Sequence, residues 1–447
     1  MTIYRATVLD TPGELGRPHG LRTDSDCALV VHDGTITART DIATARREHP
    51  ADEEIDLREG LLLPGMIDTH VHFPQVRALG GLGMPLLEWL RLRALPEEAR
   101  LVDTAYAREV AKEFLGGLTT SGTTTAMVFG SHFPQAVDVL FEEAEQTGLR
   151  ITSGLVVSDR ILREDLLLDP AATLEAGRQL ARRWHGRGRL RYAVTPRFSL
   201  STTDEMLAAA AELFHEQQAG LAGELWFTSH INENVDEIAQ VRELFPDATG
   251  YLDTYARHGL VSPRSILAHN VHPQPEELTA IAAAGAAVAH CPTSNSALGS
   301  GLFPLREHLD AGVQVALGSD VGAGTGFGIL KEGLQAYFMQ QLRGPAGIQL
   351  GAADLLHLAT RSGALALGLA DEVGDLSTGK QFDAIWVRPR SGGTLQTVLR
   401  HADDAEDTLA KLFALGASAD IESVWVGGQE ITHHRPTAVG LAPEGAA

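Results

Sequence analysis

Cysteine is scarce in this chain of 447 residues, which has only Cys27 and Cys291. Two thiols cannot build a disulfide framework or a cysteine-rich zinc module, and their scarcity is typical of proteins from a reducing compartment. Long apolar runs are also missing: no stretch approaches the roughly 18 residues of a transmembrane helix. The N-terminal residues lack the apolar centre of a secretory signal. These absences predict a cytoplasmic protein with no membrane span.

Positive charge is scarce as well. Lys and Arg together number 36 against 58 Asp and Glu, so the formal net charge is −22. Nucleic acids and anionic membranes are bound through clustered Lys and Arg, and we therefore expect neither as a partner. Apolar residues at 44% and charged residues at 21% are ordinary for a folded protein. The 18 histidines are the unusual count, and it matters which of them come together.

Two sequence textures divide the chain. Residues 1 to about 60 contain short apolar runs between turn residues, which predicts antiparallel β structure. From Leu61 onward, short β-rich runs alternate with segments of helical period, which predicts parallel βαβ units. There are eight such runs, at residues 62–72, 123–130, 151–157, 190–198, 224–230, 265–269, 286–291 and 313–320.

Eight βα units in about 310 residues fit an α/β fold with a closed (β/α)8 TIM barrel, predicted over residues 64–372. After about residue 372 the pattern returns to short strands, as in FDAIWVRP and SVWVGGQEI. These strands could pair with the N-terminal ones. We therefore predict a small composite β-sandwich domain formed by both chain ends, residues 1–63 and 373–432. The tail, residues 433–447, is predicted to be disordered.

Polar residues gather at the carboxyl ends of the runs, where a barrel places its chemistry. His70 and His72 end the first run and, two residues apart on a strand, point to the same face. Later runs end in His230, His269 and Asp320, and barrel closure would bring all five together. One strand-end histidine alone would be read as structural, but the whole set predicts a metal site. Nitrogen and oxygen ligands without a thiolate suit zinc or iron(II).

Glu233 follows His230 by three residues. A carboxyl group beside a metal that it does not bind is suited to move protons as a general acid and base. The alternative is an ordinary carboxylate favoured by a helix N-terminus. Its position next to His230 favours the proton-transfer role.

Several segments carry a family resemblance. PGMIDTHVH at 64–72 and the order of the strand ends resemble the amidohydrolase superfamily. HFPQ at 72–75, PLLEWL at 85–90 and VTPRFSLS at 194–201 are similar to the guanine deaminase family within it. The resemblance spans nearly the whole chain. The fourth run, RYAVTPRFSL, has no lysine, which favours the single-metal branch over the branch in which a modified lysine bridges two metals.

The resemblance implies a zinc-dependent hydrolysis of guanine to xanthine and ammonia in purine catabolism. It implies one zinc ion per subunit, with iron(II) as an alternative, and a cytoplasmic homodimer. The small-molecule partner would be the purine base. Gln75, Arg197, Phe198 and His230 would contact it, and Arg197 could donate paired hydrogen bonds to O6 and N7.

The resemblance also implies catalytic roles for Glu233, His269 and Asp320. Asp320 would accept the proton of the attacking water. Glu233 would protonate ring N3 and then help the amine to leave. His269 would stabilise the attacking oxygen, and whether it also binds the metal stays open. Trp89 is either a cover for the site or a packed anchor. His132 is a barrel-mouth candidate with no assigned role, and His290 and Cys291 are expected to be structural. His433 and His434 are expected to be tail residues.

Two other functions fit part of the pattern. A related single-metal enzyme could deaminate 8-oxoguanine, a pterin or an aminotriazine, with the metal ligands kept and Gln75 and Arg197 changed. A non-catalytic scaffold could share the fold, but such a protein is recognised by lost ligands, and here none is lost.

Overall fold

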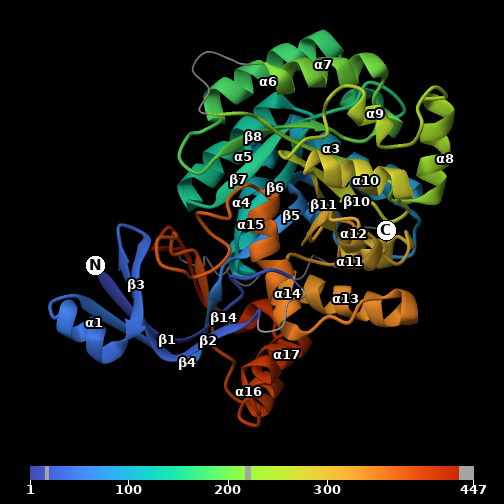
Figure 1. The fold of residues 1–447 in the computed structure, drawn as a ribbon. Helices are drawn as coiled ribbons and strands as arrows, with labels where there is room; N and C mark the ends of the chain where they lie inside the picture. Colours follow the sequence, from blue (N-terminus) through green and yellow to red (C-terminus); the bar gives the residue numbers. More distant parts are fainter. Residues whose placement is uncertain (16–19, 217–222, 432–447) are drawn as a thin grey trace, which may run out of the picture.

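The computed structural model describes residues 1–15, 20–216 and 223–431. The strands of these residues form two separate sheets (Figure 1). One sheet has eight parallel strands in sequential order. Its outer strands are joined by backbone hydrogen bonds from Asp320 N to His70 O at 2.8 Å and from His72 N to Val321 O at 2.9 Å. The (β/α)8 barrel is therefore confirmed. Its strands are β5 (Met66–His72), β6 (Thr123–Ser131), β7 (Arg150–Val157), β8 (Arg191–Pro196), β9 (Trp226–Ile231), β10 (Ser265–His269), β11 (Ala287–His290) and β12 (Gln314–Leu317).

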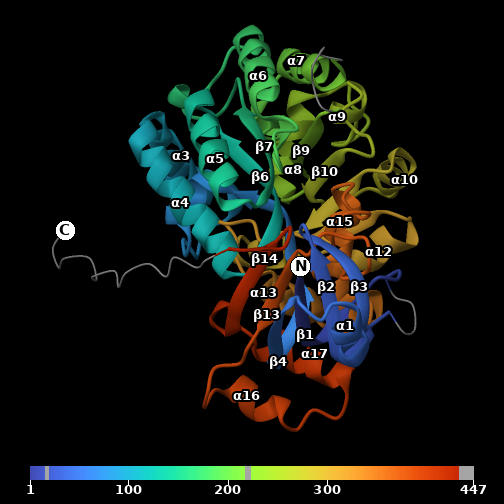
Figure 2. The same cartoon turned by 90° about the vertical axis from the view of Figure 1, so that its left-hand side faces the viewer.

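Helices cover the outside of the barrel (Figures 1 and 2). Buried positions recur along each helix at helical spacing, and the strands between them are buried along nearly their whole length, as expected where helices cover a parallel sheet. Side chains at the N-caps fix where helices begin, as Asp103, Asp169 and Thr203 do. The longer helices are α4 (Thr104–Thr120), α5 (Pro134–Thr147), α6 (Pro170–Trp184), α7 (Asp204–His215), α8 (Val235–Leu244), α10 (Pro275–Ala284) and α13 (Ile329–Leu342).

The second sheet is built from both chain ends, as predicted. Its seven strands are hydrogen-bonded in the order β15-β14-β13-β4-β1-β2-β3. One face buries an apolar cluster that includes Tyr4, Phe382 and Trp425, whose rings pack on one another. The strands are β1 (Thr2–Asp10), β2 (Arg22–His32), β3 (Thr35–Asp41), β4 (Glu53–Pro64), β13 (Ala384–Val387), β14 (Ile421–Val426) and β15 (Gln429–Glu430).

The first predicted run is shared between the two sheets. Residues 62–64 end β4, and β5 begins at Met66. Gly65 stands between them, against Thr124 at the start of β6, where a Cβ would lie 2.3 Å from the threonine side chain. A close approach of this kind requires glycine. The chain therefore passes from one sheet to the other within a single residue.

The two strands predicted after residue 372 are present, but two helices that were not predicted lie between them, α16 (Thr394–Leu399) and α17 (Ala405–Leu415). Asp404 caps α17, and Leu409, Leu412 and Phe413 form its buried face at helical spacing. This helix packs beside α13 and α14 (Ala352–Ala359).

No helix among the described residues is both long and apolar enough to cross a membrane. The tail at 433–447, with His433 and His434, lies outside the described residues.

Candidate active site

The structure brings the five predicted metal ligands together at the carboxyl ends of β5, β9, β10 and β12. The His72 Nε2 atom lies 3.2 Å from the Nε2 atoms of both His70 and His230. Asp320 Oδ1 lies 3.3 Å from His70 Nε2 and 3.2 Å from His72 Nε2. His269 joins His70 and His230 in a group whose ligand atoms all lie within 4.8 Å of one another. All five side chains are buried.

The donor set fits a divalent metal ion. His230 Nδ1 donates to the carbonyl oxygen of Arg197 at 2.6 Å, which leaves its Nε2 lone pair facing the cluster. Burial lowers the pKa of His70 to about 3 and that of His230 well below its ordinary value, so both rings are neutral, the form that binds metals. Tetrahedral zinc with Zn–N bonds near 2.05 Å spaces its ligand atoms by roughly 3.3 Å. The observed spacings of 3.2–3.3 Å agree with that value.

His269 lies between this cluster and Glu233. Its Nδ1 donates to Asn295 Oδ1 at 3.2 Å, which turns Nε2 toward the site. That Nε2 lies 3.9 Å from Asp320 Oδ2 and 3.6 Å from Glu233 Oε2. The position suits both roles predicted for His269, metal ligand and hydrogen-bonding neighbour.

The surroundings of Glu233 favour the neutral form of its carboxyl group. Its side chain is buried, and Oε1 has no hydrogen-bond partner among the described residues. Burial, with the negative charges of Asp320 and Glu237, raises the pKa of Glu233 well above its ordinary value. A buried carboxyl group with a raised pKa that lines a cavity is suited to donate a proton to a bound molecule.

Hydrogen bonds from buried side chains fix the backbone of the loop that carries Glu233. Glu237 Oε2 accepts hydrogen bonds from the backbone N–H groups of Glu233 at 3.1 Å and Asn234 at 3.2 Å. Asn232, with φ at +48°, is fixed by its amide, which donates to Asn270 Oδ1 at 3.0 Å and Glu277 Oε2 at 2.8 Å.

Left-handed backbone recurs at the other strand ends, with φ at +76° for His269, +44° for Asn270 and +48° for Asp320. Such conformations are costly outside glycine and concentrate at functional sites. The surrounding hydrogen bonds therefore hold these strand ends in a conformation that the isolated chain would avoid.

A cavity opens on the metal cluster. The residues predicted to contact the base, Gln75, Arg197, Phe198 and His230, all line it. Trp89 does so too, so it forms part of the cavity wall. The other apolar lining residues are Leu86, Leu90, Leu298 and Ala323.

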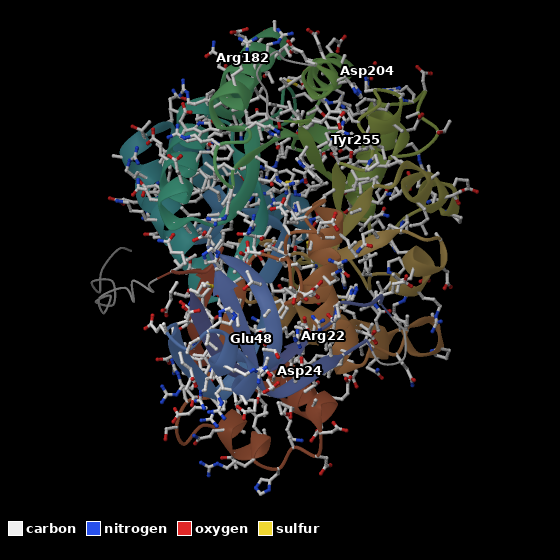
Figure 3. The ribbon with its side chains drawn as sticks, turned by 60° about the vertical axis from the view of Figure 1, so that its left-hand side comes forward. Arg22, Asp24, Glu48, Arg182, Asp204 and Tyr255 are labelled. Atoms are coloured by element: carbon white, nitrogen blue, oxygen red, sulfur yellow. The ribbon has the colours of Figure 1, made fainter. Side chains whose placement is uncertain are left out.

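Two residues that position the site, Tyr255 and Asp68, were not predicted from the sequence. Tyr255, labelled in Figure 3, donates from its hydroxyl to the His230 carbonyl oxygen at 2.8 Å. Asp68 accepts from the backbone N–H of His70 at 3.1 Å and of Ser319 at 3.0 Å. Asp68 stands inside the PGMIDTHVH segment, so its motif could have singled it out.

The structure shows a contact for His132, whose Nδ1 lies 3.3 Å from Glu98 Oε2. Glu98 itself was not singled out from the sequence. His290 stacks on Phe303 with ring centroids 4.1 Å apart, and Cys291 is buried beside it. Neither lines the cavity, in keeping with the structural role predicted for them.

Comparison with known proteins agrees with the fold. The sequence profile described as the amidohydrolase family matches residues 61–431, which is most of the chain. The chain therefore belongs to the amidohydrolase family.

Guanine deaminases are among the proteins that this chain is similar to. The probable guanine deaminase of Deinococcus radiodurans is 60% identical over 434 residues, covering 96% of this chain and 98% of that protein. The solved structure of E. coli guanine deaminase matches with a TM-score of 0.93 at 35% identity, covering 97% of this chain and all of the other. Guanine deaminase from C. acetobutylicum, solved with guanine bound in its active site, matches at 0.88 and 26% identity, covering 96% of this chain and 100% of that one.

Proposed function

We propose that this chain is a guanine deaminase, a hydrolase that converts guanine and water into xanthine and ammonia. The observation that carries the proposal is one cavity in which the metal cluster, Glu233 with its raised pKa, and the pair Arg197 and Gln75 meet. The 60% identity to a probable guanine deaminase over nearly the full length supports the same reaction.

We further propose one zinc ion per subunit, with iron(II) as the alternative. His70, His72, His230 and Asp320 would hold it, and His269 would either join them or stand beside them. When bound, such an ion lowers the pKa of a water molecule toward about 7 and so supplies a nucleophile at neutral pH.

The side chains of the site supply the proton transfers. Asp320 meets His70 and His72 through Oδ1, which leaves Oδ2 to accept the proton of the attacking water. Glu233 donates its proton to ring N3 as the oxygen adds to C2. The proton held by Asp320 then passes, with the help of Glu233, to the amine, which leaves as ammonia. The proton of the new hydroxyl group on C2 returns Glu233 to its starting state. His269 Nε2, 3.6 Å from Glu233 Oε2, is placed to steady the attacking oxygen.

Gln75 and Arg197 line the cavity and form its polar recognition wall. Arg197 can donate to O6 and N7, and the Gln75 amide beside it can serve the same edge of the base. Phe198 and His230 offer flat surfaces to the purine ring, with their own ring centroids 6.1 Å apart. Adenine presents an amino group where guanine has O6, so a donor would meet a donor, and adenine should be a poor substrate.

An ammonia-release assay across several bases tests the proposal. We expect the metal-loaded protein to favour guanine over 8-oxoguanine, pterins and aminotriazines, with xanthine as the product. A preference for one of the other bases would move the chain to a different aminohydrolase. Purification without metal and without activity would favour the scaffold.

We also propose that the enzyme works as a homodimer in the cytoplasm, in purine catabolism. Light scattering on the purified protein tests the oligomeric state.

A further inference from the structure

Glu98 is a buried carboxylate outside the roles assigned so far. It lies on α3 (Leu95–Ala99) and is 2% exposed. Side chains from three other segments meet it. Gln75 Nε2 donates to Oε1 at 2.7 Å, and Arg197 Nη1 donates to Oε1 at 2.9 Å and to Oε2 at 2.7 Å. His132 Nδ1 lies 3.3 Å from Oε2. Glu98 thus touches both polar residues of the recognition wall without lining the cavity itself.

An ionised carboxylate can only accept hydrogen bonds, so it fixes how its partners are oriented. The Gln75 amide must turn its nitrogen toward Glu98, and its Oε1 then lies 3.3 Å from the backbone nitrogen of Gly322. Arg197 spends Nη1 alone on Glu98, which leaves Nε and Nη2 for a ligand.

The neighbours of Glu98 favour its ionised form. Burial alone would raise its pKa, but the Arg197 charge and the contacts from His132 and Gln75 hold that pKa below its usual range. Glu98 in turn supplies the counter-charge for the Arg197 guanidinium, which would be costly to bury without a partner.

The same short segment forms the apolar wall of the cavity. Leu86 and Trp89 on α2 (Leu86–Trp89) and Leu90 on the π-helical η2 (Leu90–Ala94) line the cavity, and η2 runs directly into α3. Single π turns are frequent at functional sites. Glu98 therefore ties this wall to the polar residues that face the base.

We propose that Glu98 is a positioning residue that orients Gln75 and Arg197 toward the carbonyl edge of the purine. The inference rests on the proposed function. It predicts that Glu98 acts on the part of the substrate that carries O6, and not on the reacting amine at C2. Loss of its charge should weaken recognition of O6 and leave the chemical step nearly intact.

The test is the pair of variants Glu98→Gln and Glu97→Gln, assayed with guanine and 2-aminopurine. The second base has the same amino group at C2 but no oxygen at C6. It is followed by its KM if it is turned over, and otherwise by its inhibition constant against guanine. Glu97 is the matched control: it is the adjacent residue on the same helix, and it pairs with Tyr106 and with Arg100 away from the cavity.

For Glu98→Gln we expect the guanine KM to rise about tenfold, the effect of one weakened charge-assisted hydrogen bond, with kcat within about threefold. The constant for 2-aminopurine should stay nearly unchanged, so the preference for guanine falls about tenfold. Glu97→Gln should leave both constants unchanged. Equal losses for the two bases, or no loss for guanine, would overturn the proposal.

Glu98→Asp provides a second reading if the Gln variant does not fold. It keeps the charge but withdraws the carboxylate by one methylene, so it should lose part of the guanine preference in the same selective way. Loss of both bases equally would again refute the role. A wild-type protein that releases no ammonia from guanine would refute the proposed function instead, so the two failures are distinguishable.

Discussion

Glu233→Gln is the most informative substitution at the site. Glu233 is 3% exposed, and His269 Nε2 lies 3.6 Å from its Oε2. Because burial raises the pKa of this carboxyl group and so favours its neutral form, the change replaces it with a neutral group of the same shape. Folding and metal binding should therefore survive. What is lost is the ability to give up and regain a proton.

General acid–base catalysis contributes typically about 10²–10⁴-fold, equivalent to roughly 2.7–5.4 kcal/mol of transition-state stabilisation. We expect kcat for guanine to fall by that factor, with the zinc content per chain unchanged by elemental analysis. Glu243→Gln, an exposed glutamate on the following helix, is the control and should keep full activity. A Glu233→Gln protein with near-normal kcat would refute the assigned proton transfer.

Three further outcomes follow from the same structure. Arg197→Ala should raise the guanine KM by about 10–150-fold, the range for a lost hydrogen bond to a charged group of roughly 1.5–3 kcal/mol, and an unchanged KM would show that the base lies elsewhere. Removal of the metal with a chelator should lower Tm by ~4 °C, if the ion was present at about 1,000 times its Kd, and added zinc should restore it; a Tm insensitive to both would argue against the metal site. Burial raises the pKa of Glu332, which bonds Thr293, from 4.5 to about 8. The stability that this proton supplies is present below pH 4.5 and lost as pH rises through about 8. Glu332→Gln should therefore gain Tm relative to the wild type between about pH 5 and pH 9, and a Tm difference that does not change with pH would contradict the shift.

The barrel and its metal cluster could be predicted because local sequence reports on them directly. Each strand is a short buried apolar run, and His70, His72, His230, His269 and Asp320 mark the ends of four of them. Closure of the barrel then fixes which ends are neighbours. The two helices after residue 372 were missed because the segment between the strands FDAIWVRP and SVWVGGQEI was given no assignment.

Other features depend on tertiary placement that no local pattern carries. Glu97 and Glu98 are adjacent and identical in type, yet one faces Tyr106 and Arg100 near the surface and the other holds the recognition wall. The left-handed backbone of Asn232 and Asp320 is likewise imposed by surrounding hydrogen bonds. Asn and Asp tolerate this conformation better than most residues, so their presence allows the left-handed backbone but does not predict it.

The central claim is that this cavity deaminates guanine. The most direct measurement follows guanine, xanthine and ammonia together in one reaction with the metal-loaded protein, beside a parallel reaction with adenine. The account predicts that each guanine consumed yields one xanthine and one ammonia, with far slower release from adenine. Ammonia from adenine and none from guanine would contradict it.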